Sequence, residues 1–172
     1  MAITKVTISD IPEVNLLVNS AYRGEESKKG WTSEEHLLDG QRIDEQMLSD
    51  YLSTKNATLL KYTDDDTQKI IGTVYLEVKG TKLYLGMLTV SPSLQGKGTG
   101  KKLLKAADDY AKQHNCHKIG ITVISARLEL IDWYERHGYV FTGNVEPFPD
   151  NANVGIPKEP LELIEMEKVL VF

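Results

Sequence analysis

The chain has 172 residues, a formal net charge of −5 at pH 7 and a hydrophobic fraction of 41%. These values predict one domain over residues 1–172 with a sizeable core, and the acidic balance argues against general nucleic-acid binding. Because no stretch of the sequence resembles a membrane span or a signal peptide, we expect no membrane association and a cytoplasmic location.

The first half of the chain is expected to begin with a strand and a helix. Apolar alternation predicts a strand over Ile3–Ile8, and start signals at Asp10 and Pro12 predict a helix that ends near Tyr22. The polar, acid-rich stretch Arg23–Asp50 is expected to form loop and short helices. Three strands joined by short turns, and therefore antiparallel neighbours, are predicted at Ala57–Tyr62, Ile70–Val78 and Leu83–Val90.

The second half of the chain is expected to continue the alternation. A long amphipathic helix has its apolar residues at helical spacing, namely Leu103, Leu104, Ala107, Tyr110 and Ala111. The strand Lys118–Ser125 follows, so this strand–helix–strand unit requires a parallel pair. A second helix is predicted from the apolar face of Leu130, Ile131, Trp133 and Tyr134, with Gly138 as a left-handed cap. Two strands, Tyr139–Val145 and Leu161–Val169, complete the sheet.

The single cysteine, Cys116, cannot form an internal disulfide, which is typical of a reducing compartment. His114 and His117 flank it, but no second cluster of ligands follows. We therefore expect no metal site.

A glycine-rich turn joins the strand ending at Val90 to the long helix. Gly96, Gly98 and Gly100 occupy alternate positions, which lets the backbone approach a ligand closely. The first N–H groups of a helix have no partner within it and attract anions. Lysines crowd the same place, at positions 97, 101 and 102. The turn therefore predicts a phosphate site.

Two common phosphate motifs do not fit this turn. A nucleotide P-loop needs a glycine where the chain has Gln95 and a Ser or Thr where it has Lys102. A dinucleotide fingerprint needs a third glycine where Lys101 or Leu103 stands, and an acidic residue that the next strand lacks.

The remaining pattern, Leu-x-Val-x-Pro-x-x-Gln-x-x-Gly-x-Gly, runs from Leu88 to Gly100. It closely resembles the acyl-CoA pyrophosphate loop of the GNAT superfamily of N-acetyltransferases, and the segment Arg127–Tyr139 resembles a later helix of that family. The resemblance implies a single-domain fold of the α/β class, in which the sheet is mixed as in α+β proteins. In it a central mixed sheet is flanked by helices and contains two parallel strands that splay apart to admit acyl-CoA.

The resemblance also implies roles for individual residues. Backbone groups of Leu88, Thr89 and Val90 would pair with the pantetheine arm and polarise the thioester. The pyrophosphate would be held by Gln95, Gly96, Lys97, Gly98, Thr99, Gly100 and Lys101. Arg127, which stands where many members carry Asn, would contact the CoA arm. Tyr134 would give a proton to the departing thiolate.

The general base and the acceptor site are predicted from position. Glu77 lies on a central strand and shares a face with Tyr75, so it is the candidate base, with His36 as an alternative. Tyr22, Arg23 and Trp31 fall where the family has its variable substrate loop.

The sequence therefore predicts an enzyme that moves an acetyl group from acetyl-CoA to a primary amine of a small molecule by direct transfer. Acetylation of a protein N-terminus or lysine is an alternative activity, and a CoA-binding module without turnover is an alternative of another class. A homodimer is compatible with the sequence.

Overall fold

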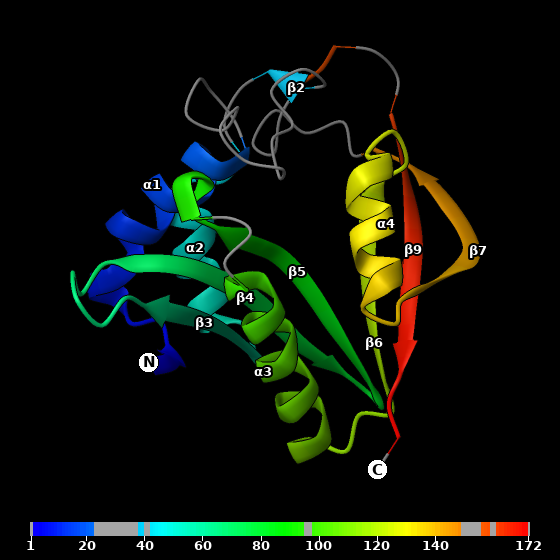
Figure 1. Cartoon of the computed structure of the whole chain (residues 1–172), viewed down its shortest axis with the longest axis horizontal. Helices are drawn as coiled ribbons and strands as arrows, with labels where there is room; N and C mark the ends of the chain where they lie inside the picture. The colour runs from blue at the N-terminus through cyan, green and yellow to red at the C-terminus, as the bar shows by residue number, and fades with distance from the viewer. Residues whose placement is uncertain are drawn as a thin grey trace.

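The computed structural model describes residues 2–22, 38–39, 42–94, 98–148, 156–158 and 161–171. Within these ranges seven strands form one sheet in the order β1-β3-β4-β5-β6-β9-β7 (Figure 1). They are β1 (Ala2–Lys5), β3 (Ala57–Thr63), β4 (Ile70–Lys79), β5 (Lys82–Val90), β6 (Lys118–Ile124), β7 (Val140–Pro147) and β9 (Glu162–Val169). A separate pair joins β2 (Leu38–Asp39) to β8 (Ile156–Pro157). The helices are α1 (Ile11–Tyr22), α2 (Glu45–Ser53), α3 (Thr99–Gln113) and α4 (Leu128–Arg136), with 3-10 turns at Ile8–Asp10 and Pro92–Leu94.

Helices cover both faces of the sheet. On one face, α1 and α2 bury Val14, Val18 and Leu48 against strand residues that include Leu59 and Tyr75. On the other face, α3 and α4 share a larger core, to which Leu83, Leu85, Leu103, Leu104, Ile121, Leu130 and Tyr134 belong. None of the described helices is long and apolar enough to span a membrane.

The parallel strands β5 and β6 form a wedge, as the sequence predicted. Their register runs only from Lys82 opposite Lys118 to Tyr84 opposite Gly120. Beyond these pairs the strands diverge, which Figure 1 shows as a V that opens away from the C-terminus. The expected mixed α/β fold with splayed strands is thus confirmed.

A bulge in β5 lies beside the opening. Thr73 pairs with Thr89 and Tyr75 with Gly86, so Met87 and Leu88 together stand opposite one residue of β4. Met87 has a φ of +53°, a rare conformation for a residue with a side chain. The bulge turns the backbone of β5 where the strand borders the wedge.

The first strand ends earlier than the sequence predicted. The prediction of Ile3–Ile8 is wrong after Lys5, because the Asp10 carboxylate accepts a hydrogen bond from the Thr7 backbone N–H at 2.8 Å and starts a helical turn. The other predicted helices and strands end within a few residues of the observed ones.

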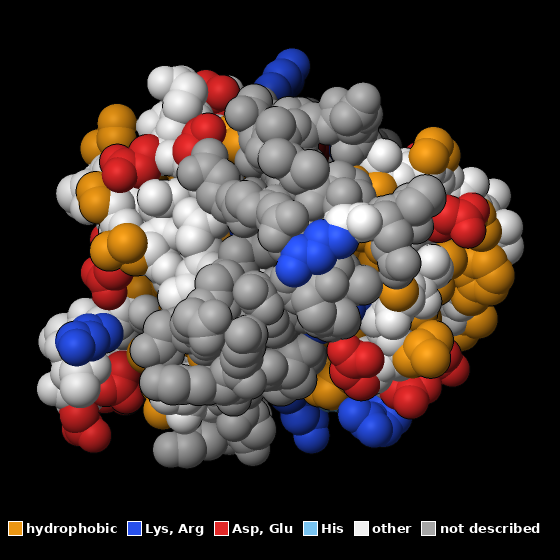
Figure 2. Space-filling view, turned by 90° about the horizontal axis from the view of Figure 1, so that it is seen from above, with side chains coloured by type: hydrophobic (Ala, Val, Ile, Leu, Met, Phe, Trp, Pro, Cys, Tyr) orange, Lys and Arg blue, Asp and Glu red, His pale blue; other side chains and the backbone are white. Residues whose placement is uncertain are grey.

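Strand β7 forms one edge of the sheet, and every one of its residues is exposed. Val140, Phe141 and Val145 are the large apolar side chains on it. Figure 2 shows hydrophobic side chains gathered at the end of the molecule where β7 lies.

Candidate active site

A cavity of about 260 Å³ occupies the wedge. Strand β5 lines it from Tyr84 to Leu88, and strand β6 from Thr122 to Ile124. The other lining residues are Tyr22, Arg42, Tyr51, Leu130, Tyr134, Phe148 and Leu163. Leu130 and Tyr134 belong to the core on the α3/α4 face, whereas Tyr22 belongs to the core on the α1/α2 face. The cavity therefore crosses the sheet between the splayed strands, with lining residues from both of its faces.

Tyr134 projects from α4 into this cavity and is only 6% exposed. Burial raises the pKa of its phenol well above the usual value, and the nearby phenols of Tyr22, Tyr139 and Tyr84 act in the same direction, against the charge of Arg127. A phenol with a raised pKa keeps its proton at neutral pH. Tyr134 is therefore suited to donate a proton to a strong base formed beside it, such as a thiolate.

The bulge of β5 is held by a residue from α1. The Tyr22 hydroxyl donates a hydrogen bond to the Leu88 carbonyl, and both residues line the cavity. The Thr89 hydroxyl donates to the Met87 carbonyl at 2.9 Å, and Val90 pairs with Gly72 of β4. Of the three residues predicted to hold the pantetheine arm, Leu88 lies at the cavity, and the other two are buried beyond it.

The glycine-rich turn is described from Gly98 onward, and Gln95, Gly96 and Lys97 lie outside the described residues. Gly98 has a φ of +83° and stands directly before α3, a conformation that favours glycine. Thr99 and Gly100 are buried in the first turn of α3, and Lys101 is exposed.

Close packing favours glycine at position 100, which the sequence analysis did not predict. A Cβ atom at this position would lie 3.2 Å from the ring of Trp133. Glycine therefore lets the start of α3 approach α4 closely, in addition to any role toward a phosphate.

Glu77 is not among the cavity residues. Its carboxylate accepts a hydrogen bond of 2.6 Å from the Tyr75 hydroxyl, and its cross-strand neighbour Tyr84 lines the cavity instead. Burial, followed by the Glu77 carboxylate, raises the pKa of Tyr75, so this phenol keeps its proton and remains the donor. For Glu77 to act as the general base, a water molecule would have to bridge its carboxylate and the cavity.

Arg127 is 1% exposed and stands immediately before α4. Its Nε donates to the Glu129 carboxylate at 3.1 Å, and it is absent from the cavity lining. Its guanidinium is thus buried near Tyr134 rather than at the surface of the wedge.

The side of the cavity next to α1 contains residues that the sequence analysis did not select. Arg42, Tyr51 and Tyr84 line the cavity together with Tyr22. The alternation of the predicted strand could have placed Tyr84 on the same face as Tyr75, but no local motif marks Arg42. Of the predicted acceptor residues, Arg23 and Trp31 lie outside the described residues, as does His36.

Comparisons with known proteins agree with this geometry. Residues 20–151 match the family description "Acetyltransferase (GNAT) domain". A spermine/spermidine N(1)-acetyltransferase of Bacillus subtilis strain 168 is 30% identical over 69 residues, and so is a probable spermine N(1)-acetyltransferase of Bacillus subtilis subsp. natto strain BEST195. These matches cover 40% of this chain and 45% of each relative, so less than half of the relatives' length is spanned.

Solved structures are similar over nearly the whole chain. The ribosomal-protein-S18-alanine N-acetyltransferase of Escherichia coli superposes with a TM-score of 0.73 at 14% identity, covering 99% of this chain and 94% of that one. The ribosomal-protein-alanine N-acetyltransferase of Brucella melitensis gives 0.72 at 17% identity, covering 99% and 100%. A GNAT family acetyltransferase from Elizabethkingia anophelis with acetyl-CoA bound gives 0.58 at 20% identity, covering 73% and 82%. At these identities the likeness establishes the fold.

Proposed function

The chain belongs to the GNAT family of acetyl-CoA-dependent N-acetyltransferases, and from this premise we propose that its acceptor is a primary amine of a small molecule. The observation that carries the proposal is the cavity that crosses the sheet beside Tyr134. Its volume of about 260 Å³ is close to the lower end of the range for small-molecule sites, which supports a short amine as the acceptor. The partial match to polyamine acetyltransferases agrees with a small amine.

The proposed reaction is a direct transfer without a covalent enzyme intermediate. An alkylammonium has a pKa of about 10.4, so it must lose a proton before its nitrogen attacks the thioester carbonyl. We assign this proton to Glu77, acting through water. The C–N bond forms first, and the oxyanion is stabilised by a backbone N–H of the β5 bulge. The C–S bond then breaks, and the thiolate takes the proton of Tyr134. The nitrogen gives its second proton to water, and the Tyr134 phenolate regains a proton from water.

The residues proposed to hold acetyl-CoA are those that the family resemblance implies. They are Leu88, Thr89, Val90, Gln95, Gly96, Lys97, Gly98, Thr99, Gly100, Lys101 and Arg127. Of these, Leu88 lines the cavity, Gly98 and Thr99 stand at the start of α3, and Arg127 is buried outside the cavity lining. Tyr22, Arg23 and Trp31 are proposed for the acceptor. In support, Tyr22 lines the cavity on the face opposite to Leu130. A cytoplasmic location and a homodimer stay predictions.

Release of free thiol from acetyl-CoA, measured across a panel of small amines, amino acids and peptides, tests the proposal. We expect turnover with at least one class of small amine. Turnover with peptides alone would establish the protein-acetylating alternative, and a protein that binds CoA but turns over no acceptor would be the non-catalytic module.

Thermal melts with acetyl-CoA, NAD and ATP test the ligand separately. At one hundred times its dissociation constant, a ligand stabilises the fold by about 2.7 kcal/mol. We expect that shift with acetyl-CoA, and a shift with NAD or ATP alone would contradict the assignment.

A further inference from the structure

Arg42 is fixed in place at the acceptor end of the cavity. Its backbone N–H donates to the Asn19 side-chain oxygen at 2.8 Å, and the next N–H, of Ile43, donates to the same oxygen at 3.1 Å. The Asn19 amide nitrogen in turn donates to the Ile43 carbonyl at 3.0 Å. Asn19 projects from α1, so one bond from Arg42 and two from Ile43 tie this stretch of backbone to that helix.

The side chain of Arg42 is also positioned. Its guanidinium carbon lies 5.4 Å from the centre of the Tyr22 ring, within the range of a cation–π interaction. The ring itself is anchored, because the Tyr22 hydroxyl donates to the Leu88 carbonyl. The guanidinium also lies near Tyr51, where its charge opposes the rise in pKa that burial causes. The positive charge therefore has a preset place in the cavity.

No carboxylate among the described residues forms an ion pair with this charge, although Glu77 and Arg42 both act on the pKa of Tyr51. Among the described residues that line the cavity, Arg42 has the only charged side chain. Glu77, whose carboxylate also acts on Tyr51, is outside the cavity lining and accepts a hydrogen bond from Tyr75.

A guanidinium in such a place selects an anion. Its planar fork matches a carboxylate with two parallel hydrogen bonds, and a partly closed cavity strengthens them. A second ammonium group at the same position would meet a like charge and be disfavoured.

We propose that the acceptor carries a carboxylate beside its primary amine and that Arg42 binds this carboxylate, which makes the substrate a member of the amino-acid class. The proposal rests on the proposed function of the cavity and narrows it. An acceptor with a carboxylate would distinguish this chain from the polyamine acetyltransferases, which match only 40% of it. Arg42 lies on the acceptor face, so the affinity for acetyl-CoA should not depend on it.

Matched acceptors test the proposal. Thiol release from acetyl-CoA is measured with α-, β- and γ-amino acids, with the carboxamide of each, and with diamines of similar length. For the wild type we expect kcat/KM to be about ten- to a hundredfold higher for the best acid than for its carboxamide. Arg42→Gln should abolish this ratio, Arg42→Lys should leave part of it, and Arg42→Glu should favour diamines.

Arg136→Gln serves as the matched control, because Arg136 is exposed on the last turn of α4. It should keep the wild-type ratio, and all variants should keep the wild-type KM for acetyl-CoA. Melting curves identify any variant that fails to fold. If Arg42→Glu does not fold, the acid-to-carboxamide ratios of Arg42→Lys and Arg42→Gln test the proposal.

Two failures are distinguishable. Equal turnover of acid and carboxamide by the wild type, or an unchanged ratio in Arg42→Gln, would overturn the role of Arg42 while leaving amine acetylation intact. Absence of thiol release with every amine would overturn both the proposed function and this inference.

Discussion

At the scale of single residues, Tyr134 offers the sharpest test of the chemistry. Burial raises its pKa, so its phenol is protonated at neutral pH. Tyr134→Phe keeps the ring and its packing but removes the proton. We expect turnover to fall about 10²-fold, while the dissociation constant of acetyl-CoA stays near the wild-type value. Single-turnover kinetics and calorimetric titration measure the two quantities separately.

Tyr139 provides the control for this substitution. Its ring lies 5.4 Å from that of Tyr134, and it is 1% exposed, but it does not line the cavity. Its hydroxyl has no hydrogen-bond partner within the described structure, so Tyr139→Phe should leave turnover unchanged and stability unchanged or higher. Wild-type turnover by Tyr134→Phe would assign that hydroxyl to structure and leave water as the acid.

At the scale of elements, the junction of β5 and α3 should carry the CoA pyrophosphate. Gly98→Val places a side chain at a φ of +83°, and the structure leaves open space within 4 Å of that Cβ. A bulky group would occupy the space in which we place the phosphate. We expect the variant to fold, with some loss of stability from backbone strain, and to lose the thermal shift caused by CoA.

Gly80→Val separates strain from binding. Gly80 has a φ of +65° in the turn between β4 and β5, and a Cβ atom there would meet nothing within 4 Å. This variant should carry a similar strain and keep the full CoA shift. A folded Gly98→Val protein with an unchanged shift would mean that the turn is structural.

The elements were predictable where the signal is local, and the site was predictable only in part. Glycines and a helix start encode the turn at Gly98, and apolar spacing encodes α3 and α4, so these elements were found. Arg42 was missed because its place depends on Asn19, more than twenty residues earlier in the chain. Glu77 was selected for its position on a central strand, but its bond from Tyr75 and the wedge geometry emerge only from tertiary packing.

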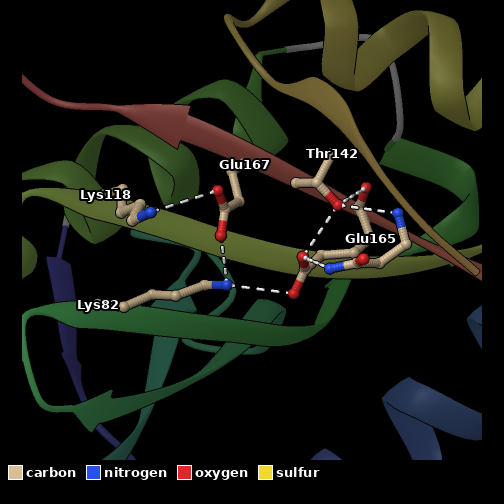
Figure 3. Close-up of polar contacts among 6 residues, drawn as sticks. Lys82, Lys118, Thr142, Glu165 and Glu167 are labelled. Carbon is tan, nitrogen blue, oxygen red and sulfur yellow. Dashed lines mark hydrogen bonds and ion pairs between the residues drawn. The ribbon is translucent and has the colours of Figure 1, made fainter.

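At the scale of the whole molecule, the wedge needs a closed end as well as an open one. Lys82 begins β5 and extends across β6 to Glu165 and Glu167 of β9, and Lys118 also pairs with Glu167 (Figure 3). Gly120 makes the crossing possible, since a Cβ there would overlap the Lys82 Cε. Thr142 and Asn144 of β7 donate to Glu165 at 2.9 Å each. These bonds join four strands at the end of the sheet where β5 and β6 still pair.

The pKa values of Glu165 and Lys82 set the pH range over which this network stabilises the fold. The Asn144 amide, followed by Thr142 and Lys82, holds the pKa of Glu165 below its usual 4.5 despite burial. Burial lowers the pKa of Lys82, but the bonds to Glu167 and Glu165 raise it overall above 10.5. The contribution of Glu165 is therefore complete above pH 4.5 and is lost as pH falls through its lowered pKa. The contribution of Lys82 is complete below pH 10.5 and is lost as pH rises through its raised pKa.

Lys82→Met should reveal this window. We expect it to lower the free energy of unfolding by about 1 kcal/mol near neutral pH, because the half-buried pairs are lost. The deficit should stay constant across neutral pH and shrink below pH 4.5, where the wild type loses the Lys82–Glu165 pair as Glu165 is protonated. Urea unfolding at a series of pH values measures it. Lys105→Met, which removes an exposed pair with Asp109 on α3, should change stability little at any pH. A Lys82→Met deficit that persisted unchanged into acid would assign the side chain's contribution to packing over Gly120, and the closed end of the wedge would then rest on the strand ladder alone.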